Sequence, residues 1–187
     1  MSGVIRPLLL ALARDNLFIP IWSDKIGHEW RRNAARVWEV SPELLEAEWQ
    51  AMEAEFPDAN VSRKPAGLLG EPERNLVYSD PKDWHVILAG HQAHEATPDA
   101  EVSILTWNIK DFKRNELRRL GLGLSDPDRL LALMWEKEQE RVERAIHRVI
   151  QTLIESGRRR PEAIHSLLKR ERLFQLAKRF ETKCHAD

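Results

Sequence analysis

The chain has 187 residues, of which 42% are hydrophobic and 32% are charged, and its formal net charge is -1. This composition excludes a disordered tail protein and a strongly basic scaffold that coats nucleic acid through bulk charge. The longest uninterrupted apolar stretch, residues 7–13, is far shorter than the roughly 20 residues that span a bilayer, so we expect no membrane partner. A single cysteine, Cys184, excludes a disulfide framework and a cysteine-based zinc site, and it favours a cytoplasmic protein.

Charge is distributed unevenly along the chain. Residues 1–126 hold 15 Lys and Arg against 20 Asp and Glu, whereas residues 127–187 hold 14 against 10. Clustered carboxylates can bind a divalent cation and a basic surface can approach phosphate, although solvated helix faces are the commoner cause of such a difference. We expect two parts, a domain of residues 1–126 and a helical C-terminal extension of residues 127–187.

The first part opens with two predicted helices. Apolar residues at helical spacing predict a helix from residue 5 that ends at residues 14–16. Ser23 is placed to cap the second helix, and Glu29 lies at the edge of its inward face. That inward face is expected to comprise Ile26, Trp30, Ala34 and Val37.

A third helix is predicted from Ser41, because a capping hydroxyl there precedes proline and an acidic residue. Its apolar stripe is expected to comprise Leu45, Trp49, Met52 and Phe56. Residues 59–62 are predicted to form a short strand, and residues 64–72 a loop.

The next segment alternates a helix with strands. Asp80 is a predicted helix cap and Asp83 lies in the first turn. The strands are predicted at residues 102–106 and 121–124, and the alternation indicates an α/β domain with a parallel sheet. The helix has a slim face that could lie close to the sheet, formed by Val86, Ala89, Gly90 and Ala93.

The tail is predicted to be helical throughout. Residues 126 and 127, Asp and Pro, begin a long helix that ends at Gly157, and a further helix runs from Pro161 to Phe180. The basic residues of this tail are consistent with a solvated surface, with phosphate contact or with an acidic partner; they include Arg158, Arg159, Arg160, Lys169, Arg170 and Arg172.

The residues that carry chemistry are acidic or amide side chains near the predicted ends of elements. Asp83 lies in the first turn of a helix, and Asn108 and Asp111 follow the carboxyl end of a strand, where open α/β sheets place ligands. Together with Glu29 and Asp80 they form a set of hard oxygen donors of the kind that suits Mg²⁺ or Mn²⁺. A metal ion would remove the repulsion between such carboxylates.

Each member of this set also has a structural alternative. Asp83 could belong to a capping arrangement with Asp80, and Glu29 could be a solvated surface residue. Histidines on one predicted helix, His85 among them, lack the second ligand cluster that a zinc site needs. Trp84 and Trp107 flank the acids and could stack on RNA bases, although several tryptophans lie at apolar helical positions typical of a core.

Three segments of the chain carry a family resemblance. They are FIPIWSDKI at residues 18–26 with Glu29, SDPKDWHV at residues 79–86 with Ala89, and ILTWNIKDF at residues 104–112. In this order they resemble the PIN-domain family of metal-dependent ribonucleases, especially the VapC-like toxins of bacterial toxin–antitoxin pairs. The resemblance covers residues 3–126, and the helical tail looks like the C-terminal extension of one VapC-like subgroup.

The resemblance implies a PIN-like three-layer α/β fold with a short parallel sheet, plus an all-helical extension. It implies hydrolysis of phosphodiester bonds in single-stranded or loop RNA, with acidic positions around one or two Mg²⁺ or Mn²⁺ ions. By position it assigns Glu29, Asp83, Asn108 and Asp111 to the catalytic and metal-binding set. The implied partners are an RNA substrate and an antitoxin protein, and a homodimer is a further expectation.

One departure from the family leaves two alternatives open. PIN domains begin with a buried central strand that ends in an aspartate, and this sequence has only residues 1–4 in that place. Either the start codon has been set too late, or the chain is a truncated, inactive descendant that binds RNA or a protein. A third alternative is a purely helical interaction protein in which residues 102–106 are not part of a sheet.

Overall fold

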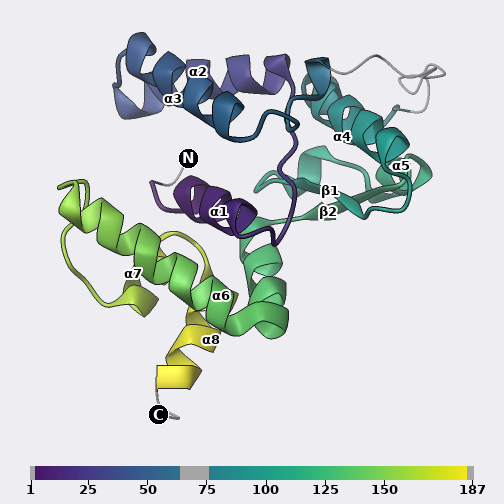
Figure 1. Cartoon of the computed structure of the whole chain (residues 1–187). Helices are drawn as coiled ribbons and strands as arrows, with labels where there is room; N and C mark the ends of the chain where they lie inside the picture. Colours follow the sequence, from purple (N-terminus) through teal and green to yellow (C-terminus); the bar gives the residue numbers. More distant parts are fainter. Residues whose placement is uncertain (1–2, 64–75, 185–187) are drawn as a thin grey trace. The chain divides into compact units, whose positions relative to one another are not determined.

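The computed structural model describes residues 3–63 and 76–184, which belong to two compact units (Figure 1). One unit is Pro20–Ser125, and the other combines Met1–Ile19 with Asp126–Asp187. This division differs from the expected parts, residues 1–126 and 127–187, because the first helix packs on a C-terminal helix. The loop expected at residues 64–72 lies outside the described residues.

Short polar caps set the start of the helices in the Pro20–Ser125 unit. The Ser23 hydroxyl accepts a hydrogen bond from the Ile26 N–H at 3.3 Å, and the Ser41 hydroxyl accepts one from the Leu44 N–H at 3.4 Å. Both predicted helix starts are confirmed. The elements in chain order are α2 (Asp24–Trp38), α3 (Pro42–Glu55), the 3-10 helices η1 (Val61–Arg63) and η3 (Pro81–Asp83), α4 (Trp84–Ala96), β1 (Val102–Leu105), the 3-10 helix η4 (Ile109–Asp111), α5 (Arg114–Arg119) and β2 (Leu122–Ser125).

The sheet consists of β1 and β2, which run parallel with Val102 opposite Leu122 and Leu105 opposite Ser125. Helix α4 lies against this sheet through Gly90, where an added Cβ would be 3.4 Å from the side chain of Leu122. The small face predicted for this helix is therefore confirmed. The strands also show that the purely helical alternative is wrong: the chain is a mixed α/β protein that is mostly helical.

Two predictions in this unit need correction. Residues 59–62 form an isolated parallel bridge between Trp22 and Asn60 followed by η1, so they do not form a regular strand. Val37 is 59% exposed, whereas Trp30 and Ala34 of the same helix are buried. The apolar spacing continues for one turn beyond the part of α2 that is buried, and spacing alone does not reveal where the burial ends.

Helices α2 and α3 enclose an aromatic cluster that is tied together by one buried acid. The ring centroids of Trp22 and Trp49 are 5.7 Å apart. Glu53, which is 7% exposed, accepts hydrogen bonds from the Trp22 indole N–H and, at 3.1 Å, from the Asn60 amide, and it pairs with Arg63. This carboxylate joins three segments that meet beside α2, and so it fixes the helix that carries Glu29.

The close approach of α2 and α3 gives a stability prediction. A Cβ added to Gly27 would overlap the end of the Trp49 ring, and that ring is itself buried. We expect Gly27→Ala to lower the free energy of unfolding by about 2 kcal/mol in urea titrations, because overpacking outweighs the better helix propensity of alanine. Asn33→Ala, at an exposed position of the same helix, is the matched control and is expected to cost nothing. Equal stability of the two variants would contradict the close packing.

The other unit is helical in its described residues. The N-terminal helix α1 packs along α6, and Asp15 at its end pairs with Arg148 at 2.8 Å. The starts of α1 and of the long helix are confirmed, and Asp126 caps the latter by accepting the Arg129 N–H at 2.9 Å. No helix among the described residues is both long enough and apolar enough to cross a membrane. The elements are α1 (Ile5–Arg14), α6 (Pro127–Glu155), α7 (Ile164–Arg170) and α8 (Phe174–Cys184).

The single helix predicted from Pro161 to Phe180 is two helices. Arg172 adopts a left-handed conformation with φ 65° between α7 and α8 and interrupts the helical backbone. The buried carboxylate of Asp128 then accepts the N–H groups of Gln175 and Leu176 at 2.9 and 3.1 Å, which caps the start of α8. This cap comes from another helix, so the local sequence pattern does not reveal it.

Candidate active site

A tight turn positions Asp83 at the start of α4. The Asp80 side chain caps η3 by accepting the Lys82 N–H at 3.0 Å, and the Asp83 N–H bonds back to the Asp80 carbonyl at 2.9 Å. Asp83 occupies the N-cap position of α4, but its side chain makes no capping hydrogen bond. Asp80 therefore serves as the cap, and the carboxylate of Asp83 is left available for another role.

The segment after β1 lies beside this turn. The Asp80 N–H donates to the Asp111 carbonyl at 2.8 Å, so the start of α4 and the residues that follow the carboxyl end of β1 are joined directly. Asn108 stands at the start of η4, is exposed, and receives at its carbonyl the Asp111 N–H at 3.1 Å. No hydrogen bond links the Asn108 amide to a described acid. The structure thus places Asp111 beside the Asp80 turn, and it leaves Asn108 exposed at the start of η4.

Helix α2 contributes Glu29 from a distant part of the sequence. The Glu29 carboxylate lies 3.2 Å from Nε2 of His85, which is in the first turn of α4. His85 is 8% exposed, and neither of its ring nitrogens has a hydrogen bond of good geometry to a described group. The contact brings Glu29 to the same helix end as Asp83, and it leaves a buried imidazole with unused hydrogen-bonding capacity.

The pKa of Asp83 is raised by its burial and by the charged groups around it. Burial raises it, the negative charges of Asp111 and Asp80 raise it further, and Glu29 adds to the same effect, whereas His85 opposes it. Charges act in this way only when they lie close together. Asp111, Asp80 and Glu29 therefore lie near enough to Asp83 for their charges to act on it, and His85 contacts Glu29 directly.

The carboxylates of this cluster are not arranged as a ready metal site. The described residues contain no group of three or more His, Cys, Asp or Glu side chains arranged to hold a metal ion, so the carboxylates stand as a loose cluster. Carboxylate oxygens are nevertheless the donors that a hard cation prefers, and the negative charges of Asp111 and Glu29 add to the burial that raises the pKa of Asp83. These three are the residues that would hold it.

One residue that the sequence did not reveal anchors the loop before this site. Glu116 of α5 is 4% exposed and accepts the N–H groups of Val77, Tyr78 and Ser79 at 2.7, 2.8 and 2.9 Å, and also the Ser79 hydroxyl at 2.6 Å. Burial works to raise the pKa of Glu116, but these hydrogen bonds outweigh it and lower that pKa. The loop that leads into Asp80 is therefore held by a charged acceptor.

No local pattern indicates this anchor, because α5 is only six residues long and the bonded residues are remote in the chain. The tryptophan considered for stacking, Trp84, instead donates its indole N–H to the Ser79 carbonyl at 3.0 Å and so supports the same loop. The exposed aromatic ring here belongs to Tyr78, whose side chain is 75% exposed.

Comparisons with known proteins were made for the whole chain. No protein-family model, no curated protein and no solved structure matched it. The residues and their arrangement are therefore the evidence about function.

Proposed function

We propose that this chain is a metal-dependent endoribonuclease of the PIN type, similar to VapC-like toxins. The observation that supports this function best is the convergence of Glu29, Asp83 and Asp111, which come from three separate segments. Two of these segments meet where the chain leaves the carboxyl end of β1, the usual position of ligands in open α/β sheets. The buried His85, whose Nε2 lies 3.2 Å from the Glu29 carboxylate, links two of these segments directly.

Each residue has a stated role in this proposal. Glu29, Asp83 and Asp111 would hold Mg²⁺ or Mn²⁺, with the amide of the exposed Asn108 as a further oxygen donor. The bound ion would activate water and neutralise charge on the phosphate that is attacked. His85 orients the Glu29 carboxylate, and Asp80 and Glu116 keep the Asp83 turn in place. No covalent enzyme intermediate is needed.

The setting of the reaction is also part of the proposal. We place the chain in the cytoplasm, where its single cysteine stays reduced, with RNA as substrate, an antitoxin as the protein that blocks it and a homodimer as its assembly. Co-purification with a small protein encoded beside it would support the antitoxin. The alternative function is an inactive PIN remnant that binds RNA or a protein without cleaving.

Metal removal tests the activity. The full chain is incubated with a fluorescent single-stranded RNA in EDTA, and Mg²⁺ or Mn²⁺ is then restored. We expect cleavage with either ion to be at least about a hundredfold faster than in EDTA, since metal-assisted hydrolysis has no comparable route without the ion. A Glu29→Gln protein purified in parallel controls for contaminating nuclease. Cleavage that persists in EDTA would contradict the metal mechanism, and RNA binding without cleavage under any ion would favour the inactive remnant.

A further inference from the structure

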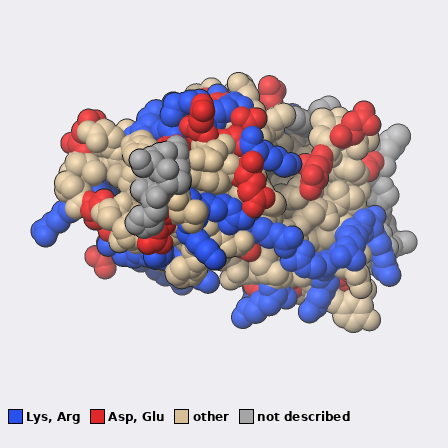
Figure 2. Space-filling view, turned by 90° about the horizontal axis from the view of Figure 1, so that it is seen from below, with Lys and Arg blue, Asp and Glu red and all other residues tan. Residues whose placement is uncertain are grey.

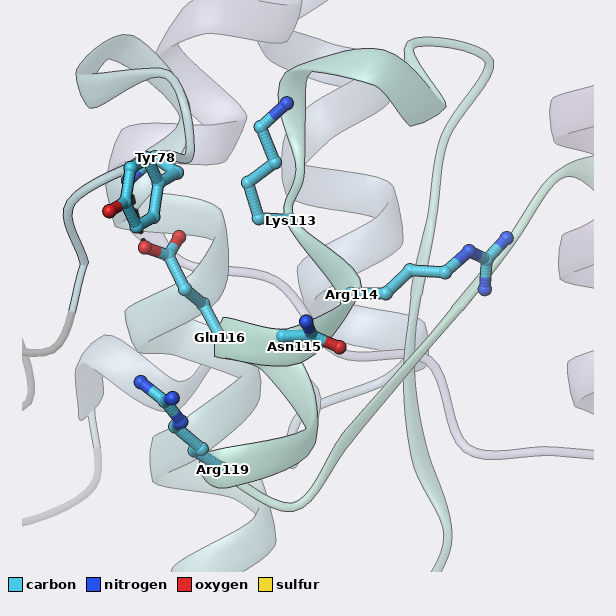
Figure 3. A pocket seen from close by; sticks show the side chains of 6 residues that line it. All are labelled: Tyr78, Lys113, Arg114, Asn115, Glu116 and Arg119. Atoms are coloured by element: carbon cyan, nitrogen blue, oxygen red, sulfur yellow. Dashed lines mark hydrogen bonds between the residues drawn. The ribbon is translucent and has the colours of Figure 1, made fainter.

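A small pocket lies between the loop at residues 77–79 and helix α5 (Figure 3). Its volume is about 320 Å³, at the lower end of the range for ligand pockets. In Figure 3 Tyr78, Glu116 and Arg119 lie on one side of α5, while the Arg114 side chain extends away from them. The lining residues are Tyr78, Lys113, Arg114, Asn115, Glu116 and Arg119.

The pocket has a positive character. Lys113 and Arg119 are exposed, and neither pairs with a described carboxylate. Arg114 donates from Nη1 to the Leu124 carbonyl at 3.3 Å, which uses part of its guanidinium. Glu116 keeps its negative charge, but its carboxylate is buried and its oxygens accept the loop donors, so Lys113 and Arg119 are the charged groups that a ligand can reach. Lys113 and Arg119 therefore give the pocket its positive charge.

The aromatic ring in this pocket is held by a fixed backbone. The Tyr78 N–H is bonded to Glu116 at 2.8 Å, while 75% of the residue's surface is exposed. The backbone at Tyr78 is thus held in place, and its exposed ring lines the same pocket as Lys113 and Arg119. Base stacking on an aromatic face, with phosphates on neighbouring cations, is how proteins bind single-stranded nucleic acid.

Several basic residues of the C-terminal helices, unlike Lys113 and Arg119, pair with acidic residues of their own unit. Arg159 pairs with Glu171, Lys169 with Glu181 at 3.2 Å, and Arg170 with Glu162. Figure 2 shows one face of the molecule, on which some Lys and Arg side chains lie beside Asp and Glu and others form stretches of their own. Much of the charge that makes the tail basic is thus already neutralised within its own unit.

The pocket adjoins the acidic cluster. Tyr78 is two residues before Asp80, and the Lys113 N–H donates to the Ser79 hydroxyl at 2.9 Å. We infer that this pocket binds one nucleotide of single-stranded RNA beside the cleavage site, with its base on the Tyr78 ring and its phosphates on Lys113 and Arg119. The inference rests on the proposed ribonuclease function, since it assigns the position of a substrate nucleotide.

Fluorescence anisotropy with a labelled 12-nucleotide single-stranded RNA in EDTA tests this, because binding is then measured without cleavage. We expect Tyr78→Ala to weaken binding about tenfold and Tyr78→Phe to bind like the wild type. We expect Arg119→Gln to weaken binding and to lower the slope of log K against log salt by about 0.7, the value for one phosphate contact on a single strand. Arg36→Gln, an exposed arginine on α2, is the matched control and should leave both quantities unchanged.

The outcomes separate this inference from the proposed function. A Tyr78→Ala effect on single-stranded RNA, but none on a duplex whose bases are already stacked, supports the nucleotide site even if no metal restores cleavage. Wild-type affinity in both Tyr78→Ala and Arg119→Gln overturns the inference, even if cleavage is metal-dependent. Equal losses of RNA affinity in Tyr78→Phe and Tyr78→Ala overturn the stacking of a base on the Tyr78 ring. A wild-type chain that does not bind RNA overturns the nucleotide site and points to a protein ligand.

Discussion

Replacing Asp83 with asparagine is expected to lower kcat/KM for RNA cleavage in Mg²⁺ or Mn²⁺ by about a hundredfold or more. This corresponds to about 2.7 kcal/mol of lost transition-state stabilisation. The amide has nearly the same shape as the carboxylate but lacks its charge, so it is a poorer donor to a hard cation. Because the Asp83 side chain caps no helix, the loss is expected without unfolding, which circular dichroism would verify.

The stability of this variant gives an independent check. The pKa of Asp83 is raised, so the folded chain holds that proton more tightly than the unfolded chain does. The ionised carboxylate therefore destabilises the fold above its folded pKa, and this cost disappears as the pH falls below its unfolded pKa. We expect Asp83→Asn to be more stable than the wild type at neutral pH, with the difference vanishing in acid.

A matched control separates the site from general charge removal. Asp99→Asn makes the same chemical change at an exposed loop position and is expected to leave both cleavage and stability as in the wild type. Unchanged cleavage in Asp83→Asn, with the fold intact, would rule out the assignment of Asp83. Lost activity combined with lost stability would instead indicate a structural role.

Removing the carboxylate of Glu116 is expected to lower the free energy of unfolding by about 3 kcal/mol. Glu116→Ala leaves three backbone N–H groups and the Ser79 hydroxyl without their acceptor, and the residue is 4% exposed. Hydrogen bonds to a charged group contribute about 1.5 to 3 kcal/mol each, and water entering the opened loop recovers part of the loss. Urea unfolding followed by tryptophan fluorescence measures this, since all tryptophans except Trp135 lie within Pro20–Ser125.

The pH dependence of that loss follows from the lowered pKa of Glu116. Its stabilisation is complete above the unfolded pKa of the carboxyl and is lost as the pH falls through the folded pKa. The difference in the free energy of unfolding between the wild type and Glu116→Ala should therefore become smaller in strong acid. Glu101→Ala, which replaces an exposed acid before β1, is the control and should have the same free energy of unfolding as the wild type. A Glu116→Ala protein within about 0.5 kcal/mol of the wild type would show that the loop does not depend on this anchor.

Local chemistry explains which parts of the fold were predictable. The caps at Ser23, Ser41 and Asp126 each act on the N–H group three residues away, so a short sequence pattern contains both partners. The cap of α8 by Asp128 and the anchoring of residues 77–79 by Glu116 join residues far apart in the chain, and no local pattern contains both partners. Contacts of this second kind account for most of what the sequence left unpredicted.

The residues of the candidate site also divide into those that a local pattern predicts and those that a distant contact brings in. Hard oxygen donors at the ends of elements identified Asp83 and Asp111, and the structure gathers them through the bond between the Asp80 N–H and the Asp111 carbonyl. Glu29 reaches the cluster only because α2 packs near α4 and meets a buried histidine. Asn108 is exposed at the start of η4, and its role stays a prediction.

The pairing of α1 with α6 has a consequence for synthesis on the ribosome. Residues 15–126 separate the two helices in the chain, so α1 emerges long before its packing partner exists. During that interval Leu8 and Leu12, which are at most 1% exposed in the finished fold, have no surface of α6 to cover them. The Pro20–Ser125 unit can fold first, while α1 remains a ligand for chaperones that bind apolar segments. A pause in translation before residue 127 should therefore increase chaperone capture of the nascent chain.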